Sequence, residues 1–360
     1  MLLFSLALAA EPVIDTTRLV VLAPAEITAM GGAGLGFARG ANGTFFNPAA
    51  PVNRRIEQTR TWGVSLAFTQ LALGPEKATD VANLGEVGPK TGGMANLGVA
   101  GFWRNFGGGL VYSGLEYRFG SALINVTEGH LAAGGSYDDG KVAVALGARA
   151  LAVHGERDGN TLDWTGQGGE VGVLASRLWD GWNLGGTFRS EVRAVPTEGG
   201  SPYPIEAAVM PWHLALGVGW TDAEHAPPRP VRVAGDLTID GAVEDGYALE
   251  TALEGEGVRR GKNLTVTPHL GFEVEAVPRR LRVRAGSYFE PTRTALASGR
   301  LHGTTGLEVR LFRLKLFKGV IDTEISWEAA VDASRGYLNL AYLGIGSWDS
   351  GLTGGQWAED

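Results

Sequence analysis

The sequence contains no cysteine, which excludes disulfide frameworks, thiol catalysis and cysteine-based zinc sites. It also lacks clusters of basic residues, and together with a net charge of −8 this argues against nucleic acid as a partner. No uninterrupted apolar run reaches the roughly 18 residues that suggest a membrane-spanning helix. A membrane-spanning strand needs no such run, because its side chains alternate between two faces.

Motifs for catalysis and cofactor binding are missing as well. The histidines show no metal-ligand spacing, and neither a Gly-x-Ser-x-Gly elbow nor a phosphate-binding loop occurs. The glycines from Gly31 to Gly36 do not complete the dinucleotide-binding pattern, and no strand clearly precedes them. We therefore expect no enzyme activity, no cofactor and no metal site.

Glycine, in contrast, is abundant. The 55 glycines are roughly twice the average share for soluble proteins, and each interior glycine costs a helix about 1 kcal/mol relative to alanine. This load disfavours a mostly helical protein. Residues 1–10 are apolar and end in Ala9-Ala10, which resembles the end of a secretory signal without its basic segment. We interpret them as a signal peptide remnant, with a frayed N-terminus as the alternative.

From Trp62 onward the chain repeats a pattern of apolar and polar alternation followed by a turn. Period-two alternation places successive side chains on opposite faces of a strand. The pattern predicts about fourteen strands within residues 61–347, followed by a polar tail at 348–360. The predicted fold class is all-β, a transmembrane antiparallel β-barrel.

The connections between the predicted strands favour a barrel over a sandwich. Odd-numbered connections are mostly long, among them residues 70–92, 120–129 and 154–167, and even-numbered ones are mostly short. Short periplasmic turns and longer external loops are typical of bacterial outer-membrane barrels. A soluble sandwich has no reason to keep this parity.

Charged residues recur on the polar face of the predicted strands, which we assign to the barrel interior. A shift of one residue in the register of a strand would move these side chains into lipid. For an Arg or Lys near the bilayer midplane this costs roughly 2–4 kcal/mol. We expect ion pairs that brace the wall, and prefer this role to acid–base catalysis for Glu273 and Glu275. The lumen candidates are Tyr112, Glu116, Arg118, Arg189, Arg232, Asp236, Glu273, Arg282, Arg284, Tyr288, Glu308 and Arg310.

A barrel of this size encloses more space than its own side chains fill. Residues 11–60 are glycine-rich and short of strand signal, and we predict that they form an N-terminal plug in the lumen. Asn47 before Pro48 suits a helix cap with proline at the first helical position, although a surface turn is the alternative. The plug candidates are Gly31, Gly32, Gly34, Asn47, Pro48 and Ala49.

The external connections hold the candidates for ligand contact. Residues 76–87 are compatible with a short amphipathic helix, and residues 194–210 are apolar enough to receive a hydrophobic ligand. Ordinary packing of loops on the rim is the alternative for both. The candidates in the second connection are Val195, Tyr203, Ile205, Val209 and Met210.

Several short motifs resemble those of the FadL-type outer-membrane transporters of hydrophobic compounds. They are Met30-Gly31-Gly32-Ala33-Gly34, Asn47-Pro48-Ala49 and the stretch from Val283 to Pro291, which ends in Glu-Pro. The resemblance implies a bacterial outer-membrane barrel with an N-terminal hatch and an opening in the wall. It also implies passive uptake of long-chain fatty acids or aromatic hydrocarbons, with membrane lipid and a hydrophobic small molecule as partners.

PorV-like barrels carry a similar glycine-rich plug and are near relatives in this resemblance. They imply an alternative function, in which a non-transporting outer-membrane barrel is the partner of a secreted or surface protein. The sequence leaves this alternative open.

Overall fold

The computed structural model describes residues 12–53, 62–74, 80–81, 83–84, 91–197, 205–222, 230–253, 257–316 and 321–348. The predicted signal remnant, Tyr203 and residues 349–360 of the predicted tail lie outside these ranges. The helices are α1 (Ala25–Ala29), α2 (Gly40–Thr44) and α3 (Leu249–Leu253), and two 3-10 turns are η1 (Leu35–Phe37) and η2 (Ala50–Val52). In the described ranges, no helix has the length and apolar character needed to cross a membrane.

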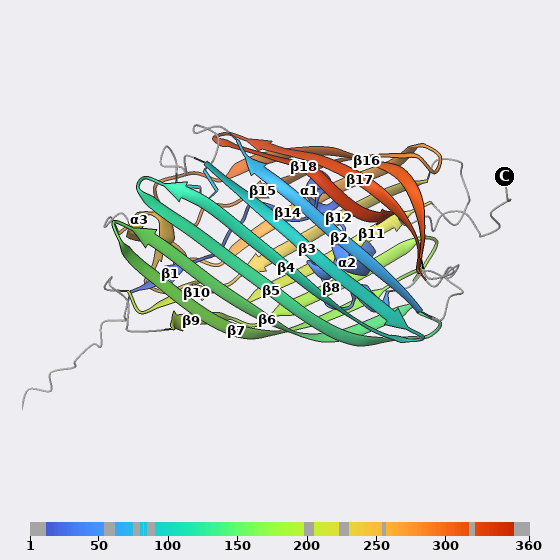
Figure 1. Cartoon of the computed structure of the whole chain (residues 1–360), viewed down its shortest axis with the longest axis horizontal. Helices are drawn as coiled ribbons and strands as arrows, with labels where there is room; N and C mark the ends of the chain where they lie inside the picture. Colours follow the sequence, from blue (N-terminus) through green and yellow to red (C-terminus); the bar gives the residue numbers. More distant parts are fainter. Residues whose placement is uncertain are drawn as a thin grey trace, which may run out of the picture.

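Fourteen antiparallel strands close into a barrel, which confirms the predicted fold class (Figure 1). β18 pairs with β2 and completes the ring. Two of the wall strands are interrupted, so that one consists of β8 and β9 and the other of β10 and β11. The segments are β2 (Trp62–Leu73), β3 (Thr91–Trp103), β4 (Phe106–Phe119), β5 (Ala122–Tyr137), β6 (Val142–Arg157), β7 (Asn160–Ala175), β8 (Trp182–Arg189), β9 (Val192–Pro196), β10 (Ala207–Met210), β11 (His213–Thr221), β12 (Val231–Asp240), β14 (Thr265–Val277), β15 (Leu281–Glu290), β16 (Arg300–Leu316), β17 (Ile321–Ser334) and β18 (Tyr337–Trp348).

Two of the connections predicted as long loops are tight hairpins instead. β4 and β5 are joined by Gly120-Ser121, and β6 and β7 by Asp158-Gly159. Gly120, Asp158 and Gly159 have φ angles of +58°, +50° and +79°. Turns with such left-handed residues match the twist of antiparallel strands, so the strands run on almost to the turn. The predicted loops 120–129 and 154–167 are therefore wrong, and most of their residues belong to the wall.

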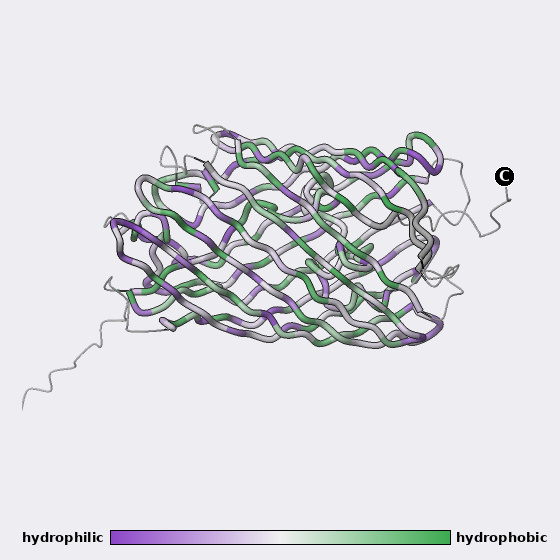
Figure 2. The backbone as a smooth tube through the Cα atoms, in the orientation of Figure 1, coloured by the Kyte–Doolittle hydropathy of each residue, from purple (hydrophilic) through white to green (hydrophobic). Residues whose placement is uncertain are grey.

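Apolar and polar residues alternate along the strands (Figure 2). Large apolar side chains on one set of alternate positions are exposed on the outer face, for example Leu146 (69 %), Leu270 (62 %) and Leu131 (60 %). Exposure of so many leucines to water would be costly, whereas lipid accepts them at no such cost. The outer face is therefore the lipid-facing belt of a membrane barrel.

Residues 12–53 contact the wall around most of its circumference. α1 packs on β15 to β18, η1 on β8, β11 and β12, α2 on β2 to β4, and η2 on β3 to β6. Strands surround these blue elements in Figure 1. Since one short segment touches so many strands of a closed ring, it contacts them from the inner side.

The beginning of this segment joins the wall itself. β1 (Val13–Asp15) runs parallel to β10 on one side and to β13 (Gly246–Ala248) on the other. Asp15 is buried, and its Oδ2 accepts a hydrogen bond of 2.8 Å from Arg293 Nε and lies 3.4 Å from Arg260 Nε. β1 thus bridges a gap in the sheet and is held there by a buried ion pair.

Candidate functional site

Glycines stand in the wall where the N-terminal segment comes closest. A Cβ atom on Gly185 would lie 2.8 Å from the carbonyl oxygen of Leu35, and one on Gly271 would lie 2.7 Å from that of Met30. Real Cβ atoms do not come so close to backbone, so these contacts require glycine. The backbone of the segment also approaches Gly286, and its side chains would lie within 3.3 Å of a Cβ atom at Gly98, Gly109, Gly172, Gly217, Gly306 and Gly344.

The glycine-rich stretch of the segment is hydrogen-bonded to two wall strands. Gly31, with a φ of +66°, places its carbonyl oxygen 2.7 Å from His269 Nδ1 on β14. Gly34 and Leu35 each donate a backbone N–H to Asp236 Oδ2 on β12 at 2.8 Å. The backbone of the plug candidates Gly31 and Gly34 therefore contacts side chains of the wall here. One of these side chains, Asp236, is a predicted lumen candidate.

Asn47 fixes the end of the segment to β7 and β8 of the wall. Its Nδ2 donates to the carbonyl oxygens of Val173 (3.2 Å) and Gly186 (3.0 Å), and its Oδ1 accepts from the N–H of Ala49 at 2.9 Å. The helix predicted to begin at Pro48 is only the 3-10 turn η2. The Asn47 side chain therefore makes a capping hydrogen bond through Oδ1 and contacts the wall through Nδ2.

Predicted lumen charges on β12, β14, β15 and β16 form one buried network. Arg284 donates to Glu273 Oε2 from Nε (2.7 Å) and to Glu308 Oε2 from Nη2 (2.5 Å). Arg232 pairs with Glu273 at 3.1 Å, and Arg282 pairs with Glu308 at 3.2 Å. Each charge meets an opposite charge, as desolvated ions require.

Two further predicted lumen residues lie near this network or near the segment. Arg189 on β8 donates from Nη2 to the carbonyl oxygen of Phe45 at 2.6 Å, and its Nε is 3.2 Å from Glu170 Oε2. Arg310 is half-buried, two residues beyond Glu308 on β16. Arg189 thus joins the wall to the N-terminal segment.

Three predicted lumen residues on β4 lie on the opposite face of the strand. Tyr112 is 47 % exposed, and Glu116 and Arg118 are also exposed, whereas Leu115 and Tyr117 are buried inside. The prediction assumed that the polar face of every strand points inward. At this height of β4 the inner face is apolar, so polarity alone selects the wrong side.

An apolar surface lines the inner face of the wall from β2 to β9, toward the rim formed by the β4–β5 and β6–β7 hairpins. We call this set the apolar inner surface. Ile14 and Val20 of the N-terminal segment and Leu249 and Leu253 of α3 pack on it. Its wall residues include Leu71, Leu73, Met94, Leu115, Tyr117, Phe119, Ile124, Val126, Leu151, Val153, Leu162, Trp164 and Val192.

Few polar groups interrupt this surface. Tyr117 donates its hydroxyl to Glu250 Oε1 at 2.6 Å and accepts from Arg18 Nη2 at 3.3 Å. A mostly apolar lining with a small number of placed polar groups is typical of sites for small hydrophobic ligands. Residues such as Leu151 and Trp164 escaped the sequence analysis, although the position of Trp164 between the polar residues Asp163 and Thr165 was a signal.

The ligand-contact candidates predicted within residues 194–210 do not all lie on the same face of the wall. Ile205 is buried in the apolar inner surface, and Met210 packs against it. Val209 is buried beside Val13 of β1, in a smaller cluster. Val195, at 48 % exposure, points outward from β9 and does not contribute to the inner surface.

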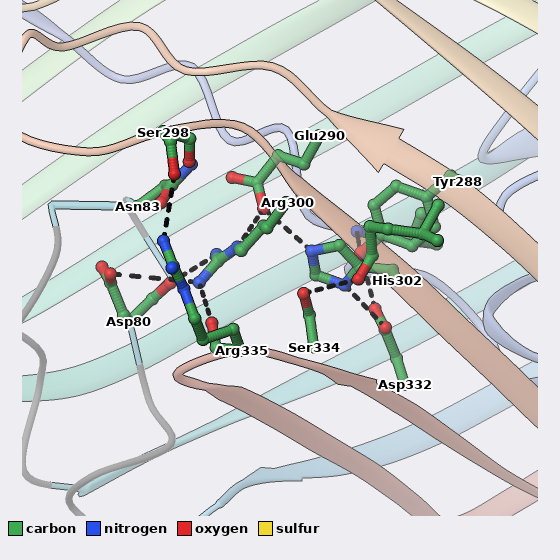
Figure 3. A network of polar contacts seen from close by, with 12 residues as sticks. Asp80, Asn83, Tyr288, Glu290, Ser298, Arg300, His302, Asp332, Ser334 and Arg335 are labelled. Atoms are coloured by element: carbon green, nitrogen blue, oxygen red, sulfur yellow. Dashed lines mark hydrogen bonds and ion pairs between the residues drawn. The ribbon is translucent and has the colours of Figure 1, made fainter.

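A second polar network near the loop rim escaped the sequence analysis (Figure 3). His302 lies between two carboxylates, with Nδ1 2.8 Å from Asp332 and Nε2 2.9 Å from Glu290. Tyr288, a predicted lumen residue, donates to Asp332 at 2.6 Å and stacks on His302 with ring centroids 4.1 Å apart. The alternation of β16 and β17 indicates the inward face, but only strand register brings these groups together.

Arg300 extends this network to the connection between β2 and β3. Its Nε lies 2.5 Å from Glu290 Oε2, and its Nη2 donates to the carbonyl oxygen of Asp80 at 2.6 Å. Asn83 donates to the carbonyl oxygen of Ser298 at 3.3 Å. Most of the predicted helix 76–87 lies outside the described residues. Among the residues that are described, no group of three or more His, Asp or Glu is arranged to hold a metal ion.

Comparison with known proteins places this geometry in a known fold. No family model matches the sequence, and no curated protein is similar to it. The CymD monoaromatic hydrocarbon channel matches with a TM-score of 0.58 and 14 % identity, over 90 % of this chain and 95 % of that chain.

Two more solved structures agree. The Pseudomonas putida toluene transporter TodX matches with a TM-score of 0.56 and 13 % identity, over 94 % of this chain and 99 % of that chain. A Pseudomonas aeruginosa FadL homologue matches with a TM-score of 0.54 and 11 % identity, over 92 % and 97 %. The chain therefore has the β-barrel fold of the FadL-type channels, as its short motifs predict.

Proposed function

We propose that this protein is an outer-membrane channel for the passive uptake of hydrophobic small molecules, with residues 12–53 as the plug that gates its lumen. The observation that carries the proposal is the apolar inner surface on β2 to β9. Water-filled porins have polar interiors. A lumen wall lined by leucine, valine and aromatic side chains instead stabilises hydrophobic solutes.

Two of the solved structures with the same fold support this proposal, since one is a monoaromatic hydrocarbon channel and the other is a toluene transporter. Long-chain fatty acids and aromatic hydrocarbons are the substrate classes that we infer. We infer that residues 12–53 gate the lumen because they lie against the apolar inner surface. Ile14 and Val20 form part of the surface on which the ligand would lie, so bound ligand displaces residues of the plug.

Uptake of labelled toluene and labelled dodecanoate tests the proposal. The assay uses bacteria that lack their own channel for hydrophobic compounds, because their lipopolysaccharide leaflet resists such solutes. We expect cells that express the protein to accumulate both compounds, or one of them, faster than cells without it. Equal uptake by the two strains, together with co-purification of a secreted or surface protein, would favour the PorV-like alternative.

Neighbouring residues on β7 supply matched variants for this assay. Trp164 is 1 % exposed and belongs to the apolar inner surface, whereas Thr165 is exposed on the outer face. Trp164→Glu places a charge in the ligand path and is expected to abolish most of the uptake. Thr165→Glu adds the same charge outside and should leave uptake unchanged. Faster gel migration before boiling than after verifies that each variant has folded.

A further inference from the structure

A buried carboxyl group of the wall meets the first helix of the N-terminal segment. Glu328 on β17 is 3 % exposed, and its Oε2 accepts the backbone N–H of Glu26 on α1 at 3.2 Å. Close packing against β18 covers this carboxyl group. A Cβ atom on Gly344 would lie 2.8 Å from the Glu328 Cβ, and one on Gly346 would lie 2.6 Å from Glu328 Oε1. Glu328 is therefore desolvated and in direct contact with the segment.

Two further carboxyl groups face Glu328. Glu308 on β16 is 2 % exposed and lies directly opposite Glu328 in the register of β16 and β17. Glu26 approaches from the side of the segment, where its Oε2 accepts a hydrogen bond of 3.2 Å from Asn42 Nδ2 on α2. Like charges directly opposite each other on neighbouring strands are destabilising, and more so in a desolvated site.

The arginines of this region pair with the other two carboxylates. Arg284 Nη2 lies 2.5 Å from Glu308 Oε2 and 3.6 Å from Glu26 Oε1. Arg310 lies two residues beyond Glu308 on β16 and forms no ion pair with Glu328. In the described ranges, no arginine, lysine or histidine at all forms an ion pair with Glu328. A negative charge on Glu328 would therefore have no counter-charge in direct contact.

A buried carboxyl group in such a place is stable in its neutral form, because desolvation and the neighbouring carboxylates both disfavour the charged form. When Glu328 loses its proton, the new carboxylate faces Glu308 and Glu26. Glu308 is held in the wall by Arg282 and Arg284. Glu26 belongs to a helix of only five residues, and its side chain is 36 % exposed. The repulsion therefore acts on the element that is held less firmly, α1.

We propose that Glu328 is a positioning residue for the plug, which holds α1 against the wall while its carboxyl group is protonated and releases α1 when the proton passes to water. The inference rests on the proposed function and adds a regulation of the same gate. The closed state then binds one proton more than the open state. By linkage, a rise of one pH unit favours the open state by up to about tenfold. Acid therefore closes the lumen, and alkali opens it.

Leakage of a small sugar into proteoliposomes measures the open state of the full chain. Swelling is recorded between about pH 5 and about pH 9, above the range in which ordinary carboxyl groups titrate. We expect the wild type to leak at least about tenfold faster at the alkaline end than at the acid end. Glu328→Gln keeps a neutral side chain in the same place and should leak slowly at every pH. Deletion of residues 11–60 is the open reference and should leak fast at every pH.

Glu116→Gln is the matched control, because it removes a carboxylate from the outer face of β4. It should keep the pH response of the wild type. If Glu328→Gln does not fold, Glu26→Gln is measured instead; it removes the opposing charge of the plug and should weaken the response. Wild-type leakage that does not change with pH would overturn the proposal, as would a full pH response in Glu328→Gln or, in its place, in Glu26→Gln.

Uptake of labelled toluene at one fixed pH separates this inference from the channel function, since toluene has no titratable group. Uptake by the wild type without a pH response in leakage would overturn the role of Glu328 and leave the channel function intact. A pH response in leakage without toluene uptake would support the role of Glu328 and overturn the channel function.

Discussion

Arg284 is a single side chain that pairs with two buried carboxylates. It is 1 % exposed and contacts Glu273 on β14 and Glu308 on β16. Removing one partner of a buried ion pair costs about 3–5 kcal/mol, because an uncompensated charge stays behind. In Arg284→Met, Glu273 keeps Arg232 and Glu308 keeps Arg282, so we expect the free energy of unfolding to fall by up to this amount, measured by urea titration in lipid vesicles. Arg118→Met, on the outer face, should change it by no more than about 0.5 kcal/mol.

A change of one methyl group tests the fit between wall and N-terminal segment. In Gly286→Ala the new Cβ would collide with the backbone of Met30 and Gly31. Overpacking of this kind costs typically 1–3 kcal/mol. We expect a lower urea midpoint for Gly286→Ala. The control is Gly303→Ala on β16, where no atom lies within 4 Å of the added Cβ. Equal midpoints for both variants would show that the segment does not press against the wall.

Among the elements, β1 depends most on its side-chain anchor, since three residues supply few backbone contacts of their own. Asp15→Ala removes the partner of Arg293 and Arg260 and leaves both guanidinium groups buried. We expect faster hydrogen exchange in residues 13–17, measured by mass spectrometry, with little change in β4 to β7. Asp163→Ala, which removes an exposed carboxylate paired with His154, is the control. Unchanged exchange in β1 would contradict the anchoring role.

The hairpins β4–β5 and β6–β7 show what sequence periodicity can and cannot establish at the scale of elements. The strands on either side of the predicted loops 120–129 and 154–167 were expected, but β5 begins at Ala122 and β7 at Asn160, earlier than predicted, and β6 continues to Arg157. The stretch 122–129 keeps its alternation, with Ala122, Ile124 and Val126 buried. This stretch is predicted as a loop only if polar side chains on the outward face are assumed to mark the end of a strand. The strands rise beyond the apolar belt, where outward polar residues are acceptable.

At the scale of the whole molecule, residues 12–53 connect most of the wall strands from within. Deletion of residues 11–60 should raise the leakage of small polar solutes through the barrel, because the wall alone encloses unfilled space. Swelling of proteoliposomes in a small sugar measures this leakage. Deletion of residues 349–360 is the control and should have no effect. A folded deletion variant that leaks no more than the intact protein would show that residues 11–60 do not close the lumen.

The sequence by itself determined the all-β class, the even number of strands, the lipid-facing belt and the glycine-rich segment ahead of the first strand. These follow from alternation and composition, which are properties of neighbouring residues. Only the tertiary structure decided which face of β4 points inward and which charges meet, as Arg284 with Glu308 or His302 with Asp332. Such contacts depend on the register between strands and on closure of the ring, which bring together residues far apart in the chain.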